Sequence, residues 1–203
     1  MQSIKSFNEL LQLIDENKKY KVLMHSCCGP CSSACIELMK NGLSIDIYYY
    51  NPNIDTKEEF DKRSEEQIRI NNILNPDCSV LIGEYLESDF SNAINGLETL
   101  GEKSIRCYNC YEFRMRKTAQ LAKELNYDFW TTTLSISPHK NSNWINEIGM
   151  KLAEEIGIPF IFSNFKLKDG YKRSIELSKE YEMYRQNYCG CKYSKKERGL
   201  TNE

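Results

Sequence analysis

Five short apolar stretches alternate with amphipathic stretches along the chain, and this alternation constrains the fold more than any other feature of the sequence. Apolar runs that alternate with helical patterns are typical of an α/β domain in which a mostly parallel sheet is covered on both faces. The expected strands are 21–25, 43–50, 79–85, 128–135 and 160–165. The expected helices are 1–20, 32–39, 56–74, 89–97, 107–125, 143–156 and 171–183.

Right-handed crossovers between such strands predict a single, doubly wound domain over residues 1–203 with a cysteine-bearing segment at 184–203. We expect the strand order 3-2-1-4-5, which places the topological switch point between the first and fourth strands. Ligands of such sheets bind at the carboxyl edge near the switch point. The loops 27–31 and 137–141 should therefore border the site.

Nine cysteines are unusual for a chain of 203 residues, and seven of them fall in three groups. No signal segment or membrane span is recognisable, so we expect a cytoplasmic protein with reduced thiols. Clustered reduced thiols bind metal or carry out redox chemistry. Cys35 and Cys78 are expected to be ordinary buried side chains. The grouped cysteines are Cys27, Cys28 and Cys31, then Cys107 and Cys110, then Cys189 and Cys191.

Seven thiols exceed the four ligands of one zinc site and suit a four-thiolate iron–sulfur cluster with a second metal or a spare redox pair. Because Cys27 and Cys28 are neighbours, we expect their side chains to diverge toward two metals. A different hypothesis starts from Cys28-Gly29-Pro30-Cys31, the thioredoxin tetrapeptide, and makes the chain a thiol–disulfide oxidoreductase. That hypothesis gives the other cysteine groups no role. A third hypothesis is a zinc-stabilised RNA-binding module.

Six blocks of residues between about residue 21 and residue 194 resemble the epoxyqueuosine reductase family called QueH. The blocks are 25–31 (HSCCGPC), 49–54 (YYNPNI), 106–110 (RCYNC), 131–140 (TTTLSISPHK), 169–174 (DGYKRS) and 184–191 (YRQNYCGC). The resemblance implies reductive deoxygenation of epoxyqueuosine to queuosine in tRNA. It also implies a 4Fe–4S cluster beside a second, mononuclear iron, on a fold like that of nucleotide α-hydrolases. The electron donor is expected to be external, because no dinucleotide fingerprint follows a strand.

Turning an epoxide into an alkene requires an acid for the departing oxygen, and a histidine can be protonated near neutral pH. His139, on a loop expected at the switch point, is the first candidate, and Asp169 is a competitor. Substrate contacts are expected from polar and aromatic side chains near the cysteine groups and the site loops. They are Asn51, Asn53, Tyr108, Lys140, Tyr171, Lys172, Arg173 and Arg185.

The formal charge of −2 conceals three basic stretches. Residues 102–117, 166–173 and 185–198 carry net charges of +3, +3 and +4, against −12 for the rest of the chain. Each stretch borders a cysteine group or an expected site loop, and tyrosines interleave them, which suits contacts to the phosphates and bases of tRNA. Basic residues that only balance thiolates, or that form an ordinary solvated surface, are the alternative.

Overall fold

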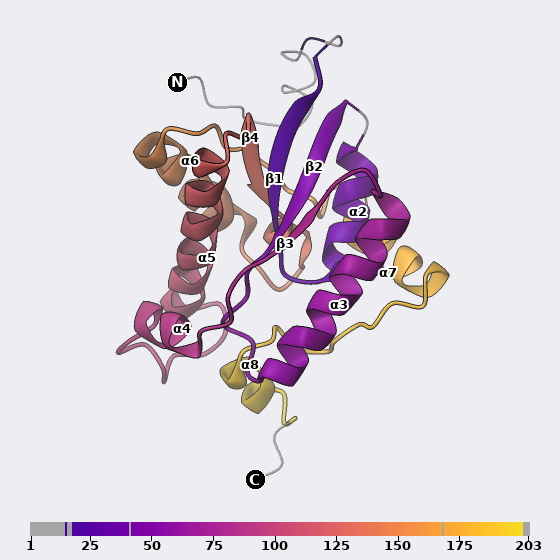
Figure 1. Ribbon diagram of the computed structural model, residues 1–203. Helices are drawn as coiled ribbons and strands as arrows, with labels where there is room; N and C mark the ends of the chain where they lie inside the picture. Colours follow the sequence, from indigo (N-terminus) through magenta and orange to yellow (C-terminus); the bar gives the residue numbers. More distant parts are fainter. Residues whose placement is uncertain (1–14, 16–17, 41, 168, 201–203) are drawn as a thin grey trace.

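The computed structural model describes residue 15 and residues 18–40, 42–167 and 169–200. A parallel sheet with the order β3-β2-β1-β4 lies between two layers of helices (Figure 1). Its strands are β1 (Tyr20–Ser26), β2 (Leu43–Tyr49), β3 (Val80–Ile82) and β4 (Phe129–Thr132). The helices are α2 (Gly29–Met39), α3 (Lys57–Leu74), α4 (Glu87–Ala93), α5 (Ile105–Glu124), the 3₁₀ helix η1 (Thr133–Ile136), α6 (Ser142–Ile156), α7 (Gly170–Glu180) and α8 (Lys192–Glu197).

The helix expected over 1–20 falls mainly on residues 1–14 and 16–17, which lie outside the described part of the chain, and Tyr20 already belongs to β1. Helices α2, α3 and α7 cover one face of the sheet, and α5 and α6 cover the other (Figure 1). Alternate residues of β1 face the two layers, as the pleat of a strand requires. Val22 and Met24 pack with apolar side chains of α2, whereas Leu23 packs with those of α5 and α6. The doubly wound α/β architecture is therefore confirmed.

The prediction of a fifth strand over 160–165 is wrong, because this segment makes only one bridge, between Trp130 and Phe160. The backbone N–H of Ile161 donates to the carbonyl of Trp130 at 2.9 Å. Strand β4 then ends at Thr132 and continues into η1, so residues 162–165 have no strand beside them. The backbone of Ser163 bonds instead to the Asn146 side chain of α6, at 2.8 and 3.0 Å. The sheet therefore has the predicted order 3-2-1-4 but lacks the predicted fifth strand.

Helix ends follow local sequence signals. The Thr56 hydroxyl accepts a hydrogen bond from the Glu59 backbone N–H at 3.2 Å, which caps α3. Asn141 caps α6 in the same way, and Gly157 ends that helix in the left-handed conformation at φ 74°. No helix within the described ranges is both long enough and apolar enough to cross a membrane.

Candidate metal centre

The first cysteine group occupies the turn between β1 and α2, at the carboxyl edge of the sheet. Cys27 follows β1, Cys28 is the N-cap residue of α2, and Cys31 lies in the first turn of that helix. The Sγ atoms of this triad lie within 4.8 Å of one another, and those of Cys27 and Cys28 are 3.9 Å apart. The expectation that Cys27 and Cys28 diverge is wrong, because the turn brings both thiols to one side. In the described part of the chain, no other three His, Cys, Asp or Glu side chains are this close together.

The three thiols of the triad hydrogen-bond to one another, and this separates their acidities. Hydrogen bonds from Cys28 and Cys31 lower the pKa of Cys27 well below its usual value. The bond to Cys27 raises the pKa of Cys28 to about 11, and bonds to Cys27 and Cys28 raise the pKa of Cys31 well above its usual value. One sulfur is therefore poised as a thiolate, the form of cysteine that binds metals.

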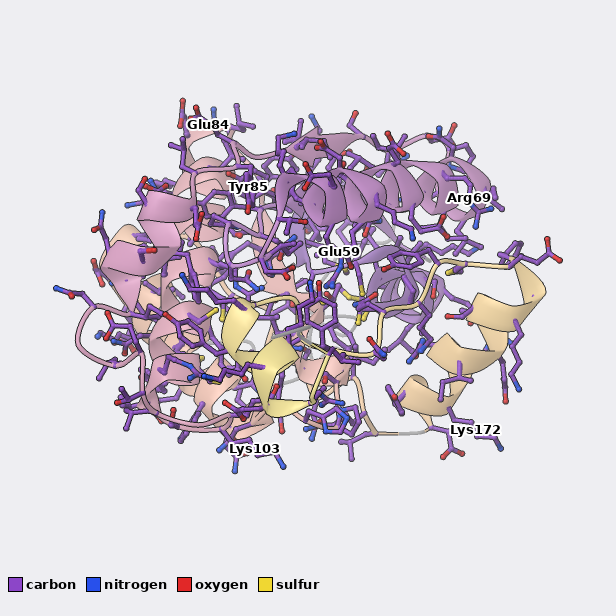
Figure 2. The ribbon with its side chains drawn as sticks, turned by 90° about the horizontal axis from the view of Figure 1, so that it is seen from below. Glu59, Arg69, Glu84, Tyr85, Lys103 and Lys172 are labelled. Atoms are coloured by element: carbon purple, nitrogen blue, oxygen red, sulfur yellow. The ribbon has the colours of Figure 1, made fainter. Side chains whose placement is uncertain are left out.

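The second and third cysteine groups lie at helix starts beside the same edge. Cys107 and Cys110 lie in the first two turns of α5, and Cys191 is the N-cap residue of α8, where its Sγ accepts a hydrogen bond from the Ser194 N–H at 3.4 Å. Cys110 and Cys191 belong to one apolar cluster beside α4. Burial raises the pKa of Cys110 to about 11 and that of Cys191 to about 12. Figure 2 shows α8 on this face of the molecule, with Lys103 near its edge.

A cavity of about 240 Å³ brings the three cysteine groups together. Cys27, Cys28, Cys31, Cys107 and Cys189 line it, whereas the buried Cys110 and Cys191 do not. The expectation that loops 27–31 and 137–141 border one site is confirmed. Soft sulfur donors from three groups around one cavity suit a thiolate-ligated iron or iron–sulfur centre. The other lining residues are Pro30, Glu102, Lys103, Tyr111, Ser137, His139, Lys140, Tyr171, Arg185, Gln186, Asn187, Tyr188 and Arg198.

Lys140 supplies a fixed positive charge to the cavity wall. Burial acts to lower the pKa of Lys140, but negative charge on the neighbouring sulfurs of Cys189 and Cys27 raises it above its usual value. His139 is exposed, and its partial desolvation together with the charge of Arg198 lowers the pKa of its ring. At neutral pH the lysine is therefore cationic, while the histidine is mostly neutral.

Four of the predicted catalytic and substrate-binding residues line the cavity: His139, Lys140, Tyr171 and Arg185. The Arg185 guanidinium lies over the Tyr171 ring at 5.4 Å, so these two side chains form one wall. Asp169, the competing proton donor, is exposed at the start of α7 and does not line the cavity.

Five predicted substrate-binding residues lie outside the cavity wall, and their contact with a substrate stays a prediction. Asn51 is only 1% exposed, and both ends of its amide are bonded within the protein, to Ser26 and Arg114. Asn53 is also buried, and Lys172 is exposed on α7 (Figure 2). The Tyr108 hydroxyl donates to Glu147 at 3.3 Å, and Arg173 pairs with Glu37 at 2.8 Å.

Some residues at the site were not singled out from the sequence. Gln186 lines the cavity, and its hydrogen bond favours the thiolate of Cys28. Tyr111 also lines it, and Arg114 hydrogen-bonds to Cys110. A spacing of four places a residue on the same helix face, so Tyr111 and Arg114 could have been found from the second cysteine group.

A family model described as Epoxyqueuosine reductase QueH matches residues 22–197. The chain belongs to the QueH family. The epoxyqueuosine reductase QueH of Streptococcus pyogenes serotype M1 is 36% identical over 193 residues, which cover 91% of this chain and 74% of that protein. The QueH protein of Thermotoga maritima is 37% identical over 180 residues, covering 87% of this chain and 91% of that one.

Solved structures show how the fold of this QueH chain relates to other proteins. A predicted subunit of a tRNA methyltransferase from Methanocaldococcus jannaschii has a TM-score of 0.53 at 15% identity, covering 79% of this chain and 76% of that one. The U34-tRNA thiolase NcsA from Methanococcus maripaludis, solved with its 4Fe–4S cluster, has a TM-score of 0.53 at 14% identity, covering 87% and 62%. At such identities the likeness shows the fold alone, an α/β fold with a parallel sheet.

Proposed function

We propose that this chain reduces epoxyqueuosine in tRNA to queuosine at the cavity lined by its cysteine groups. The observation that carries the proposal is the meeting of cysteines from all three groups at one cavity, in a chain of the QueH family. A thiol–disulfide exchange would use two of these sulfurs and a structural zinc site four. Neither alternative uses all five cysteines that line the cavity.

The chemistry defines what the cavity must supply. Two electrons and two protons enter, both C–O bonds of the epoxide break, a carbon–carbon double bond forms, and the oxygen leaves as water. The electrons come from an external donor. The residues of the chain must therefore hold the redox centre, bind the nucleoside, and direct protons to one oxygen.

The cysteines fit a 4Fe–4S cluster and a second iron, which when bound would supply one-electron transfer and a Lewis acid for the epoxide oxygen. We assign the triad Cys27, Cys28 and Cys31 to one centre, because its three sulfurs lie within 4.8 Å of one another. Cys107 or Cys189 would add a fourth thiolate to this centre, since both line the same cavity. Cys110 and Cys191 belong to one buried cluster and remain for the second iron.

Proton delivery and charge stabilisation fall to the 137–141 loop. Lys140 is cationic beside the thiolates and would stabilise negative charge on the epoxide oxygen as it leaves. His139 can donate a proton to the departing oxygen only when its ring is protonated. Because the pKa of His139 is lowered, turnover should be faster below neutral pH. Asp169, the other candidate donor, lies outside the cavity wall at the start of α7, which favours His139.

Cations around the cavity would hold the tRNA. Lys103, Arg185 and Arg198 line it, and the anionic backbone of tRNA is their natural partner. Tyr171 and Tyr188 also line it and offer aromatic surfaces to an unstacked base.

Anaerobic purification tests the proposal directly. The protein should be brown and contain acid-labile sulfide, with iron in excess of sulfide because of the second iron. With a chemical reductant it should convert epoxyqueuosine in tRNA to queuosine. Colourless protein with stoichiometric zinc and no turnover, or metal-free protein that reduces a disulfide, would contradict the proposal.

A further inference from the structure

The side chain of Arg114, on α5, is buried but incompletely bonded. It is 1% exposed. Its Nε donates to the carbonyl of Cys110 at 3.2 Å, and its Nη1 donates to Oδ1 of Asn51 at 3.1 Å. Its Nη2 has no hydrogen-bond partner within the described part of the chain. A buried, charged donor left unsatisfied is costly, so a group other than these residues is needed to accept from it.

Comparison with two other buried arginines shows what is unusual about Arg114. Arg63 and Arg106 are 2% and 3% exposed, and each is paired with a carboxylate, at 2.6 Å to Glu59 and 3.2 Å to Glu197. The Nη2 of Arg63 also lacks a hydrogen-bond partner among the described residues, so the missing carboxylate is what distinguishes Arg114. No carboxylate within 4.0 Å pairs with Arg114 among the described residues. An uncompensated cation is expensive in the interior of a protein.

Cysteines take the place of a carboxylate around Arg114. Burial acts to lower the pKa of Arg114, but negative charge on the sulfurs of Cys110, Cys189 and Cys27 raises it above its usual value. These three residues belong to the three different cysteine groups. The guanidinium is therefore electrostatically coupled to every group that meets at the cavity.

Arg114 also joins two of the groups through hydrogen bonds. Asn51 accepts from Arg114 and donates through its Nδ2 to the carbonyl of Ser26, at 2.9 Å. Ser26 immediately precedes Cys27, while Arg114 itself bonds to Cys110. One chain of bonds thus runs from Cys110 on α5 through Arg114 and Asn51 to Ser26 at the end of β1.

We propose that Arg114 is the buried counter-cation of the cysteine-ligated centre and holds two of its cysteine groups in place. This inference rests on the proposed function, because thiolates that ligate a metal provide the negative charge. A fixed cation stabilises thiolates, and hydrogen bonds behind the ligands tune the affinity of a metal site.

Cobalt(II) binding to the metal-free, full-length chain tests the role of Arg114 without an activity assay. Thiolate ligation of Co²⁺ gives charge-transfer absorption, and competition with a chelator gives the dissociation constant. We expect Arg114→Met to weaken Co²⁺ binding at least tenfold, and Arg114→Lys, which keeps the charge, to weaken it less than threefold. Met115→Ala is the matched control, since Met115 is the next buried residue on α5 and carries no charge.

The outcomes separate this inference from the proposed function. Met115→Ala should lower the urea midpoint yet bind Co²⁺ within twofold of wild type. Arg114→Met that binds Co²⁺ as tightly as wild type would overturn the counter-cation role and leave the metal centre intact. A wild-type chain with no thiolate–cobalt absorption would overturn the metal centre and the role of Arg114 together. If Arg114→Met does not fold, the test falls to Arg114→Lys, which keeps the positive charge. Co²⁺ binding by Arg114→Lys that is at least tenfold weaker than in wild type, the loss expected for the apolar variant, would contradict the role of charge.

Discussion

Single side chains decide what the cavity can do. The triad gathers three sulfurs within 4.8 Å, and Lys140 sets a positive charge beside them. Negative charge on the neighbouring sulfurs favours the protonated form of Lys140, and the lysine in turn favours their ionised form. This mutual dependence leads to a prediction for a substitution that leaves every cysteine in place.

We expect Lys140→Met to lower kcat about 10²-fold, as loss of one preorganised electrostatic group does elsewhere. Lys140→Arg should recover part of the rate, because it keeps the charge at that position. Single-turnover rates with metal-loaded protein of equal iron content give the comparison. Equal rates for Lys140→Met and wild type would show that the ammonium takes no part in the reaction.

At the scale of helices and strands, the sequence correctly predicted the elements that border the cavity. It did not correctly predict the last strand at the edge of the sheet. The β1–α2 turn and the loop before α6 were expected from apolar runs and caps, and both border the cavity. The strand over 160–165 was not a strand, because side chains of Asn146 and Ser135 satisfy its backbone, and no local pattern reveals such distant partners. The convergence of Cys27 and Cys28 was also missed, since it depends on the dihedral angles of one turn.

Close packing of α6 on the 160–161 bridge gives a prediction for Gly149. A Cβ on Gly149 would lie 2.3 Å from the ring of Phe160, which is buried. Gly149→Ala should therefore lower the free energy of unfolding by about 1–3 kcal/mol, measured by urea denaturation. Gly101→Ala is the control, because a Cβ there meets no atom within 4 Å. Equal stabilities of the two variants would contradict this packing.

The segment that carries the third cysteine group is held by Asp55. Its carboxylate accepts hydrogen bonds from Tyr188 and Lys195, both at 2.7 Å, and its backbone N–H donates to Gly190 at 2.9 Å. Burial acts to raise the pKa of Asp55, but the bonds from Lys195 and Tyr188 lower it below its usual value. A lowered pKa means that the stabilisation is present above the unfolded-state value and is lost as the pH falls through the folded-state value.

Asp55→Asn should thus lower the free energy of unfolding at pH 7 by about 1.5–3 kcal/mol, the range for hydrogen bonds to a charged group. The difference from wild type should begin to shrink as the pH falls below about 4, where the carboxyl becomes protonated in the unfolded state, and should be smallest below the lowered pKa of the folded state. Urea denaturation at several pH values gives the measurement. Asp61→Asn, which removes an exposed ion pair with Lys57, should cost under about 1 kcal/mol and serves as the control. A difference independent of pH would contradict the ionic role of Asp55.

At the scale of the whole molecule, the sequence showed where the basic stretches lie but not which of their side chains form ion pairs with acidic residues. Arg116 and Arg173 form ion pairs with glutamates of the same protein, so much of this charge is neutralised internally. Lys103 and Arg185 line the cavity, where an anionic ligand can reach them. Pairing depends on which helices lie side by side, and that information is absent from local charge counts.

Salt dependence of tRNA binding follows from the cations that remain at the cavity. Arg198 is paired with Glu102 at 3.8 Å, so contacts from Lys103 and Arg185 should give a slope of about −1.4 to −1.8 in a plot of log K against log salt concentration. Fluorescence titrations over a range of salt provide the slope. Lys103→Gln should reduce its magnitude by about one, and an unchanged slope would remove Lys103 from the tRNA interface.

The central claim is that the three cysteine groups hold the cluster and the second iron that together reduce an epoxide in tRNA. Mass analysis of nucleosides after a single anaerobic turnover, with a chemical reductant and tRNA carrying epoxyqueuosine, tests it most directly. Wild type and Cys78→Ser, whose cysteine does not line the cavity, should yield queuosine, lighter by one oxygen atom. Cys31→Ser should leave the epoxide intact. Full conversion by Cys31→Ser, or none by iron-loaded wild type, would contradict the account.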